Sequence, residues 1–248
     1  MKKIVISNRK GGSAKTTTAV NLAAHLAKNH SVLLLDLDTQ GHATIGVGVD
    51  CDEACGFHGI FHGKTLSESF TPSILENLTV SPAMELFDVY EHVNLEGILK
   101  KRFKDEDIES FFDYCVIDTP PTYDALLKNA IEVADVVIIP VVPHHLGIVG
   151  ISQMLRALYR TAIKKSSSID FIGILPVMYN PHIKEHQSSL KKIEVSFGKD
   201  KLFTPIGMDI KLSTQFEYRE PLVLSKKRVK GMRDYARFTD ELVNRLQK

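Results

Sequence analysis

Five apolar runs constrain the fold of this chain most strongly, because each is continuous rather than alternating with polar residues. They cover residues 3–7, 31–38, 114–118, 135–142 and 171–179. A strand with apolar side chains on both faces is typical of a parallel sheet that helices cover on both sides. Segments with apolar residues at helical spacing separate the runs. The chain therefore predicts an α/β fold with a doubly wound, mostly parallel sheet and helices on both faces.

The chain is expected to form a single domain over residues 1–248. Its 248 residues suit one large α/β domain, and we find no internal repeat, low-complexity tract or linker rich in proline and glycine. Residues 51–107 are the least regular part, with a short strand expected at 78–82. Three cysteines, Cys51, Cys55 and Cys115, are an odd number. They indicate a reduced, cytoplasmic protein rather than a disulfide framework.

An apolar strand, a glycine-containing loop and a helix follow one another at the start of the chain. The loop reads NRKGGSAKTT over residues 8–17. Backbone N–H groups of such a loop converge on a phosphate, and the helix N-terminus adds its positive dipole end. We expect Lys15 to neutralise the β- and γ-phosphates and the Thr16 hydroxyl to bind Mg²⁺. The common spacing GxxxxGK[ST] is met only in part, because Ala14 precedes the lysine in place of glycine.

The loop fits another pattern throughout. KGGxxK[ST][ST] is the deviant Walker A box of the ParA/MinD class of ATPases, and residues 10–17 read KGGSAKTT. In order along the chain, DLDTQGHAT (36–44) resembles the family's DxDPQGNAT switch segment, CVIDTPP (115–121) its Walker B segment, and IIPVVP (138–143) the strand end that follows. IGMDIKLSTQFEYREPL (206–222) resembles the family's IPRNVRLSEAxxxGxPI stretch. The chain is identified as a member of this class, closest to the short, Soj-like ParA proteins.

The resemblance implies a P-loop NTPase that hydrolyses ATP to ADP and phosphate with Mg²⁺, slowly without a partner. It also gives a role to Lys10, the first lysine of the box, which in the family reaches across a two-fold interface to the partner's nucleotide. An ATP-dependent homodimer with two sandwiched ATP molecules follows, since a cation donated in trans offsets the repulsion between two anionic nucleotides. The alternative for Lys10 is a solvated loop lysine. The phosphate-loop residues expected to bind nucleotide are Lys10, Gly11, Gly12, Ser13, Ala14, Lys15, Thr16 and Thr17.

Three carboxylates are expected around the metal. Asp118 ends an apolar strand, where a carboxylate reaches the crevice at the sheet's carboxyl edge and can hold Mg²⁺ through a water molecule. Asp36 and Asp38 alternate at the end of another run, so we expect their side chains to point the same way. By resemblance, Asp38 activates the attacking water and Asp36 supports the metal shell; for Asp36 the alternative is a loop-ordering carboxylate. The implied catalytic residues are Lys10, Lys15 and Asp38, and the implied metal residues are Thr16, Asp36 and Asp118.

The adenine contacts are less well defined by the sequence. Asn180 follows the run at 171–179 and could donate a hydrogen bond to adenine. Asp209 lies in the segment that lines the base side in relatives. For each residue the alternative is a role in forming a turn.

The C-terminal segment, residues 206–248, is basic although the whole chain has a net charge of +1. From Lys211 onward it carries ten basic residues against five acidic ones. Such a surface binds phosphates without sequence preference and with steep salt dependence, and the alternative is a solvated helix face. The candidate DNA-binding residues are Lys211, Arg219, Lys226, Lys227, Arg228, Lys230 and Arg233.

Together these features predict a partition or positioning ATPase. Its ATP dimer would bind DNA non-specifically on the nucleoid and be released when a ParB-like or cargo-adaptor protein stimulates hydrolysis. In MinD relatives a terminal amphipathic helix binds membrane. A membrane partner is not expected here, because the final segment, 234–248, carries acidic residues among its basic ones and resembles the closing helix of ParA-like proteins, which favours docking onto the domain. Two alternatives remain: a MinD-like ATPase that cycles on membranes, and a metabolic ATP-using enzyme of the same fold.

Overall fold

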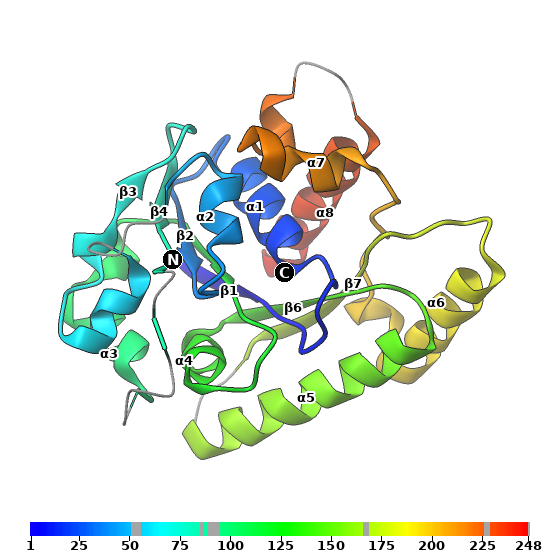
Figure 1. Cartoon of the computed structure of the whole chain (residues 1–248). Helices are drawn as coiled ribbons and strands as arrows, with labels where there is room; N and C mark the ends of the chain where they lie inside the picture. Colours follow the sequence, from blue (N-terminus) through cyan, green and yellow to red (C-terminus); the bar gives the residue numbers. More distant parts are fainter. Residues whose placement is uncertain (51–55, 85–86, 89–94, 166–168, 226–228, 248) are drawn as a thin grey trace.

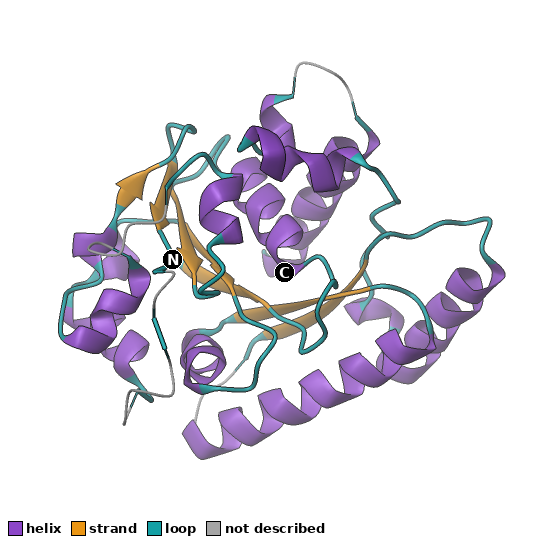
Figure 2. Cartoon of the chain, viewed as in Figure 1, coloured by secondary structure: helices purple, strands orange, loops and turns teal. Residues whose placement is uncertain are grey.

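The computed structural model describes residues 1–50, 56–84, 87–88, 95–165, 169–225 and 229–247. A seven-stranded sheet in the order β3-β4-β2-β5-β1-β6-β7 runs through the centre of the molecule (Figures 1 and 2). Its strands are β1 (Lys2–Ile6), β2 (Val32–Asp36), β3 (Thr71–Pro72), β4 (Leu78–Ser81), β5 (Tyr114–Asp118), β6 (Val136–Val141) and β7 (Phe171–Pro176).

The predicted fold class is confirmed. Every described strand pair is parallel except β3 with β4, which is antiparallel. All five apolar runs and the short run at 78–82 contain strands; β5 ends with its run, and the other strands stop one to three residues before their runs do. Strand β3 was not predicted, because it is two residues long and one of them is a proline, which in sheets is confined mainly to edges, strand ends and bulges.

Helices cover both faces of the sheet (Figure 1). The main ones are α1 (Lys15–Leu26), α2 (His42–Gly46), α3 (Ile98–Asp105), α4 (Ala125–Val133), α5 (His145–Lys165), α6 (Lys184–Phe197), α7 (Lys211–Tyr218) and α8 (Lys230–Leu246). Short 3-10 helices are η1 (Phe57–His62), η2 (Ser67–Ser69), η4 (Ile108–Ser110), η5 (Lys199–Lys201) and η6 (Leu222–Leu224). On one face α1 packs against α8, α2 and β5; on the other α4 packs against β1, α3 and α5.

Alternation along the strands divides the core in two. In β1, Ile4 and Ile6 join the cluster under α1 and α8, while Val5 joins the cluster under α4 and α5. All three side chains are fully buried. This explains why the strands read as continuous apolar runs: each face of the sheet has its own layer of helices to pack against.

The register of the central strands positions the candidate site. Ile6 at the end of β1 pairs with Asp118 at the end of β5, and Asp118 pairs with Asp36 at the end of β2. The loops after these three strands therefore start side by side at the carboxyl edge of the sheet. In the sheet, β1 lies between β5 and β6, and the chain leaves β1 for β2 on one side and reaches β6 on the other. The carboxyl ends of the strands at such a point are where parallel α/β sheets bind ligands.

Candidate nucleotide site

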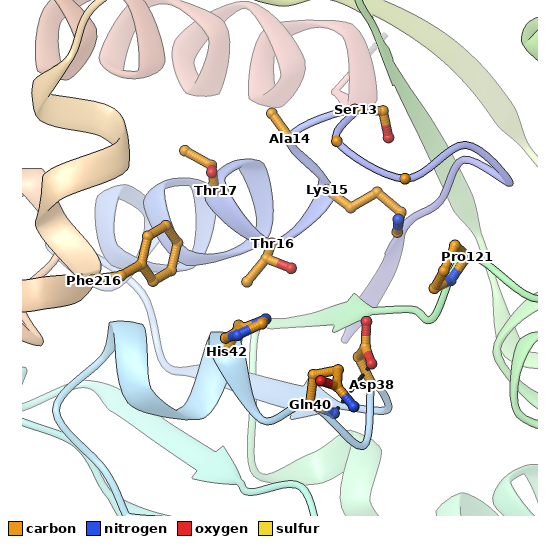
Figure 3. Close-up of a pocket in the computed structure, with 12 residues that line it drawn as sticks. Ser13, Ala14, Lys15, Thr16, Thr17, Asp38, Gln40, His42, Pro121 and Phe216 are labelled. Atoms are coloured by element: carbon orange, nitrogen blue, oxygen red, sulfur yellow. Dashed lines mark hydrogen bonds between the residues drawn. The ribbon is translucent and has the colours of Figure 1, made fainter.

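A cavity of about 490 Å³ opens between the loop after β1, the start of α1 and the loop after β2 (Figure 3). All seven predicted loop residues from Gly11 to Thr17 line it, and so does Asp38. Lys10 does not belong to its described lining. The complete lining is Gly11, Gly12, Ser13, Ala14, Lys15, Thr16, Thr17, Asp38, Gln40, His42, Pro121 and Phe216.

The loop is held by its own polar side chains. Asn8 donates to the Pro140 carbonyl at 2.8 Å and accepts from the Lys10 N–H at 3.0 Å, while Ser13 donates to the Lys10 carbonyl at 3.0 Å. Gly12 and Ala14 adopt the left-handed conformation, with φ of 69° and 59°. Ala14 caps α1 without a side-chain hydrogen bond, so the first N–H groups of the helix face the cavity without a capping partner. This arrangement suits an anion.

Lys15 carries a buried positive charge into the cavity. The residue is 7% exposed, and its ammonium points toward the side lined by Asp38 and Pro121 (Figure 3). Burial lowers the pKa of Lys15, and the charges of Asp118 and Asp38 oppose that change without reversing it. A further anion in the cavity would stabilise this ammonium, as a phosphate does.

Asp118 has an unsatisfied oxygen next to this cation. The residue is fully buried; Oδ1 accepts from the Thr119 N–H at 3.1 Å, whereas Oδ2 has no hydrogen-bond partner. Burial raises the pKa of Asp118 well above its usual range, the charge of Asp36 adds to this, and Thr16 and Lys15 oppose it. A buried carboxylate oxygen without a donor fits a magnesium ion or a water bound to it.

The described residues contain no group of three His, Cys, Asp or Glu side chains that would hold a metal alone. Magnesium at this edge would therefore depend on Thr16, Asp118, water and the phosphates of the nucleotide. This is the ligand set that the phosphate loop predicts.

Asp36 has different neighbours from Asp118, although the two pair in register. Its Oδ2 accepts from the Thr44 N–H at 2.8 Å and from the Thr44 hydroxyl at 2.7 Å, and its Oδ1 accepts from the Asp38 N–H at 3.2 Å. Burial raises the pKa of Asp36 to about 6, and the hydrogen bonds from Thr44 limit the increase. These contacts match the loop-ordering alternative. Support of the metal shell by Asp36 stays a prediction.

Asp38 lies beyond the strand, because β2 ends at Asp36. The expected alternation therefore does not apply to it: Asp38 lines the cavity, whereas Asp36 does not. Its Oδ1 accepts from the Gln40 N–H at 3.2 Å. In Figure 3 the Asp38 carboxylate faces the cavity from the side opposite α1. Activation of the attacking water by Asp38 stays a prediction.

A second, mostly apolar cavity of about 360 Å³ adjoins the first at Ala14 and Thr17. The rest of its lining is Val177, Met178, Ile206, Gly207, Met208, Asp209, Ile210, Leu212, Ser213 and Tyr235. Apolar walls beside a phosphate loop suit the flat faces of a nucleobase.

The two residues predicted to contact adenine both form turns. Asn180 is not in the described lining of the second cavity, and its Oδ1 accepts from the His182 N–H at 2.9 Å. Asp209 lines the cavity, but its oxygens accept from the Lys211 N–H at 3.0 Å and the Gly231 N–H at 2.8 Å. The turn-forming alternatives account for these contacts, and the adenine contacts stay predictions.

Four lining residues of the phosphate cavity were not among the predicted site residues: Gln40, His42, Pro121 and Phe216. The first two lie inside the quoted DLDTQGHAT segment, so its position after β2 could have indicated them. Pro121 lies in the quoted CVIDTPP segment and Phe216 in the quoted segment 206–222. The place of Phe216 at the cavity depends on the packing of α7 against α2, which the sequence does not show.

The basic C-terminal residues differ in their surroundings. Lys211, Lys230 and Arg233 are exposed. Arg219 is half-buried, and its guanidinium donates to the Val49 carbonyl at 3.0 Å and to the Asp50 carboxylate at 2.5 Å. The candidates Lys226, Lys227 and Arg228, and the pair Cys51 and Cys55, lie outside the described residues.

Comparison with known proteins establishes the family. A family model described as an AAA domain matches residues 1–171. The chromosome partitioning protein ParA of Myxococcus xanthus is 30% identical over 249 residues, which cover 98% of this chain and 88% of the relative. This chain belongs to the ParA family of P-loop ATPases. The membership predicted from the deviant Walker A box is thereby confirmed.

Solved structures agree with a ParA-type fold. The complex of Cyanothece McdA(D38A) with ATP has a TM-score of 0.86 at 20% identity, covering 100% of this chain and 96% of that one. A structure described as cobyrinic acid a,c-diamide synthase from Mycobacterium smegmatis, with bound ADP and magnesium, has a TM-score of 0.80 at 26% identity, with coverage of 100% and 96%. Among the described residues of this ParA-family chain, no helix combines the length and apolar character needed to cross a membrane.

Proposed function

We propose that this chain is a partition or positioning ATPase that binds Mg²⁺ and ATP at the phosphate loop and hydrolyses ATP to ADP and phosphate. One observation carries the proposal. Lys15 lines the phosphate cavity with a buried ammonium, and the charge of Asp118, whose Oδ2 has no hydrogen-bond partner, acts on that ammonium from the end of β5; an anion and a cation are each required there. Magnesium triphosphate supplies both in a single ligand.

Each residue then has a task in hydrolysis. The loop N–H groups and Lys15 bind the phosphates and neutralise the charge that develops on them. Magnesium, when bound, would shield the β- and γ-phosphate oxygens, with Thr16 and Asp118 as its protein side. Asp38 orients the attacking water and accepts its proton. Because catalysis here is mostly positioning, a slow basal rate is expected until a partner completes the site.

A second copy of the chain completes the site in this proposal. Lys10 is half-buried at the start of the loop and outside the described lining of its own cavity, so its ammonium can serve the nucleotide of a partner. Two chains that face each other across two ATP molecules would then dimerise only with the triphosphate.

Non-specific DNA is the proposed matrix, with Lys211, Lys230 and Arg233 as exposed contacts in each subunit. A dimer presents two such surfaces, which multiplies their weak affinities. A ParB-like or cargo-adaptor protein would stimulate hydrolysis and release the dimer from the nucleoid. The exposed contacts lie at α7 and α8, on the face of the sheet that also carries α1 (Figure 1).

DNA binding in ATP and in ADP at several salt concentrations tests this proposal. We expect binding only with ATP, and a log–log salt slope of about −0.9 for each phosphate contacted. Lys230→Glu with Arg233→Glu should abolish it. Lys191→Glu with Lys192→Glu makes the same charge change at exposed positions of α6 and should not. ATP-independent binding, or equal loss in both double variants, would reject DNA as the matrix.

The two alternatives receive different support. A MinD-like membrane helix requires a free apolar face, yet Tyr235, Phe238 and Leu242 of α8 are fully buried in the core beside α1. The metabolic alternative gains weight from the 26% identity to the structure described as a diamide synthase. ATP hydrolysis assayed with cobyrinic acid separates this alternative from the proposed function: a rate that depends on the small molecule rather than on DNA and a partner would favour the enzyme.

A further inference from the structure

A buried histidine lies directly behind the switch segment, which we define as residues 36–44. His58 on η1 is 0% exposed. Its Nδ1 accepts a hydrogen bond from the Met84 N–H at 3.1 Å, so the ring proton must be on Nε2. Nε2 in turn lies 3.3 Å from the carbonyl oxygen of Leu37 and donates to it. Leu37 is the residue between Asp36 and Asp38.

The peptide unit that precedes Asp38 is thereby held at both ends. Its carbonyl, from Leu37, accepts from His58, and its N–H, from Asp38, donates to Asp36 Oδ1 at 3.2 Å. The Leu37 N–H donates to the Asp118 carbonyl at 3.1 Å, which ties the same stretch to β5. With the peptide plane fixed, the direction of the Asp38 side chain depends only on its own rotamers.

The histidine ring itself cannot move easily. It stacks on Phe87 with ring centroids 4.6 Å apart and meets Phe57 edge-on at 5.3 Å. Burial lowers the pKa of His58 to about 4, so the ring is neutral at physiological pH, as an acceptor at Nδ1 must be. The loop after β4 supports the switch segment at a second point, because the Ala83 N–H donates to the Thr44 hydroxyl at 3.1 Å.

A histidine that only fills the core would need no particular partner on the switch segment. Here the two ring nitrogens join the loop after β4 to the peptide next to Asp38, and no other described side chain contacts the Leu37 carbonyl through a hydrogen bond. We propose that His58 is a positioning residue for ATP hydrolysis, which fixes the Leu37–Asp38 peptide plane and so directs the Asp38 carboxylate into the phosphate cavity. The inference rests on the proposed function, since it assumes that Asp38 orients the attacking water.

Two substitutions separate positioning from packing. In His58→Gln the amide nitrogen can take the place of Nε2 and donate to Leu37. In His58→Asn the shorter side chain can accept from the Met84 N–H, as Nδ1 does, but falls short of Leu37. Displacement of a catalytic group by about 1 Å can cost up to about 100-fold in rate, so we expect His58→Asn to lower kcat at least ~10-fold with KM for ATP within ~2-fold. His58→Gln should stay within ~3-fold of the wild type in kcat.

A control must account for general loss of stability in this part of the molecule. Ser81→Ala breaks a buried hydroxyl pair with Ser69, at 2.5 Å, on the adjoining β4 and has no hydrogen bond to the switch segment among the described residues. Its kcat should match the wild type at a temperature where all variants are folded. Equal kcat values for His58→Asn and His58→Gln overturn the proposal.

Asp38→Asn distinguishes failure of the inference from failure of the proposed function. If Asp38→Asn hydrolyses ATP at the wild-type rate, the proposed role of Asp38 is wrong. If Asp38→Asn is inactive while His58→Asn hydrolyses ATP as fast as His58→Gln does, only the role of His58 is wrong. A direct readout without nucleotide is the ¹⁵N spectrum of the His58 ring, which should show a neutral ring protonated at Nε2; the other tautomer or a charged ring contradicts the geometry.

Discussion

Two lysines at opposite ends of the same sheet have opposite electrostatic situations. Lys3 is the second residue of β1. Its side chain is only 11% exposed, and its ammonium lies 2.8 Å from Glu109 and 3.3 Å from Asp135. Burial acts to lower the pKa of Lys3, but these two carboxylates together raise it. Lys15 starts α1 at the carboxyl end of the sheet, and there burial outweighs the charges of Asp118 and Asp38 and lowers the pKa.

The difference separates a structural charge cluster from a binding site. At the amino end the charges satisfy one another, so folding alone completes the cluster. At the carboxyl end, one buried ammonium and one buried carboxylate oxygen are left without sufficient partners. Such unfavourable burial of charge is typical of sites where a bound ligand supplies the missing partners. This asymmetry is the physical reason to place the nucleotide at one end and not at the other.

The largest expected effect comes from removing the charge of each lysine in turn. Lys15→Ala should reduce ATP hydrolysis at least ~100-fold, because the phosphates lose a buried countercharge. Lys3→Met should leave hydrolysis within ~3-fold and lower the free energy of unfolding by about 1–2 kcal/mol, because two partly exposed carboxylates lose their partner. Steady-state kinetics and urea unfolding of both variants measure these changes. Activity loss in Lys3→Met as large as in Lys15→Ala would remove the distinction between the two ends.

Asp118→Asn tests whether the carboxyl end is destabilised for the sake of its ligand. The amide removes a buried charge that Asp36 repels, so the nucleotide-free protein should gain about 1 kcal/mol of unfolding free energy. Hydrolysis should fall at least ~100-fold, since the metal loses its protein carboxylate. Thermal unfolding with and without ATP and Mg²⁺ gives both quantities. A stability loss in the variant would mean that the Asp118 carboxylate has a partner that the structure does not show.

The pH dependence of the free energy of unfolding should report on the protonation of the His58 ring. Its folded pKa of about 4 is below the ordinary value of 6.5, so the unfolded chain binds a proton first as the pH falls. Stability from the neutral ring is therefore complete above about pH 6.5 and is lost toward pH 4, by up to about 3 kcal/mol.

Protonation of Asp36 changes the stability in the opposite direction. Its folded pKa of about 6 is above its usual 3.8, so its protonation favours the folded state as the pH falls from 6 to 4. The difference between wild type and His58→Gln isolates the histidine, because both proteins keep Asp36. Urea unfolding between pH 7 and 4.5 should show the wild type losing more stability than the variant. Parallel curves would place the His58 ring in contact with water.

The smallest effect is expected at Ala14. Its φ of 59° costs an ordinary residue about 1–2 kcal/mol, whereas glycine adopts it freely but loses more entropy on folding. Ala14→Gly should therefore raise the unfolding free energy by up to about 1 kcal/mol and leave hydrolysis unchanged within ~2-fold. Urea unfolding decides the sign, and a loss of more than about 1 kcal/mol would show that the methyl group packs in the cavity walls.

Much of the fold followed from the sequence, because burial on both faces leaves a direct pattern. Residues 114–118 coincide with β5, and the other predicted boundaries differ from the observed ones by up to three residues, as at the end of β2, where the run reaches Asp38 but the strand ends at Asp36. The phosphate loop could also be predicted from the sequence, since its residues are contiguous. Lys15 and Asp118 lie at the predicted carboxyl edge of the sheet, because β5 ends at Asp118 and the helix that starts at Lys15 follows the loop after β1.

Contacts that depend on tertiary packing were not predictable. The role of Thr44 in holding Asp36 requires α2 to fold back over the end of β2, and the bond from His58 to Leu37 joins residues 21 apart in sequence across an irregular segment. The basic segment shows the same limit: composition pointed to Arg219, but its partner Asp50 is visible only in the folded chain. Charge alone does not tell a free cation from a paired one.

The central claim is that the unsatisfied end of the sheet binds a nucleotide that joins two chains. Light scattering with a non-hydrolysable ATP analogue and Mg²⁺ tests it most directly, with ADP and Lys10→Ala as matched comparisons. We predict the mass of two chains for the wild type with the analogue, and of one chain with ADP or in Lys10→Ala. A single-chain mass for the wild type at saturating analogue, or an unchanged dimer in Lys10→Ala, would contradict the account.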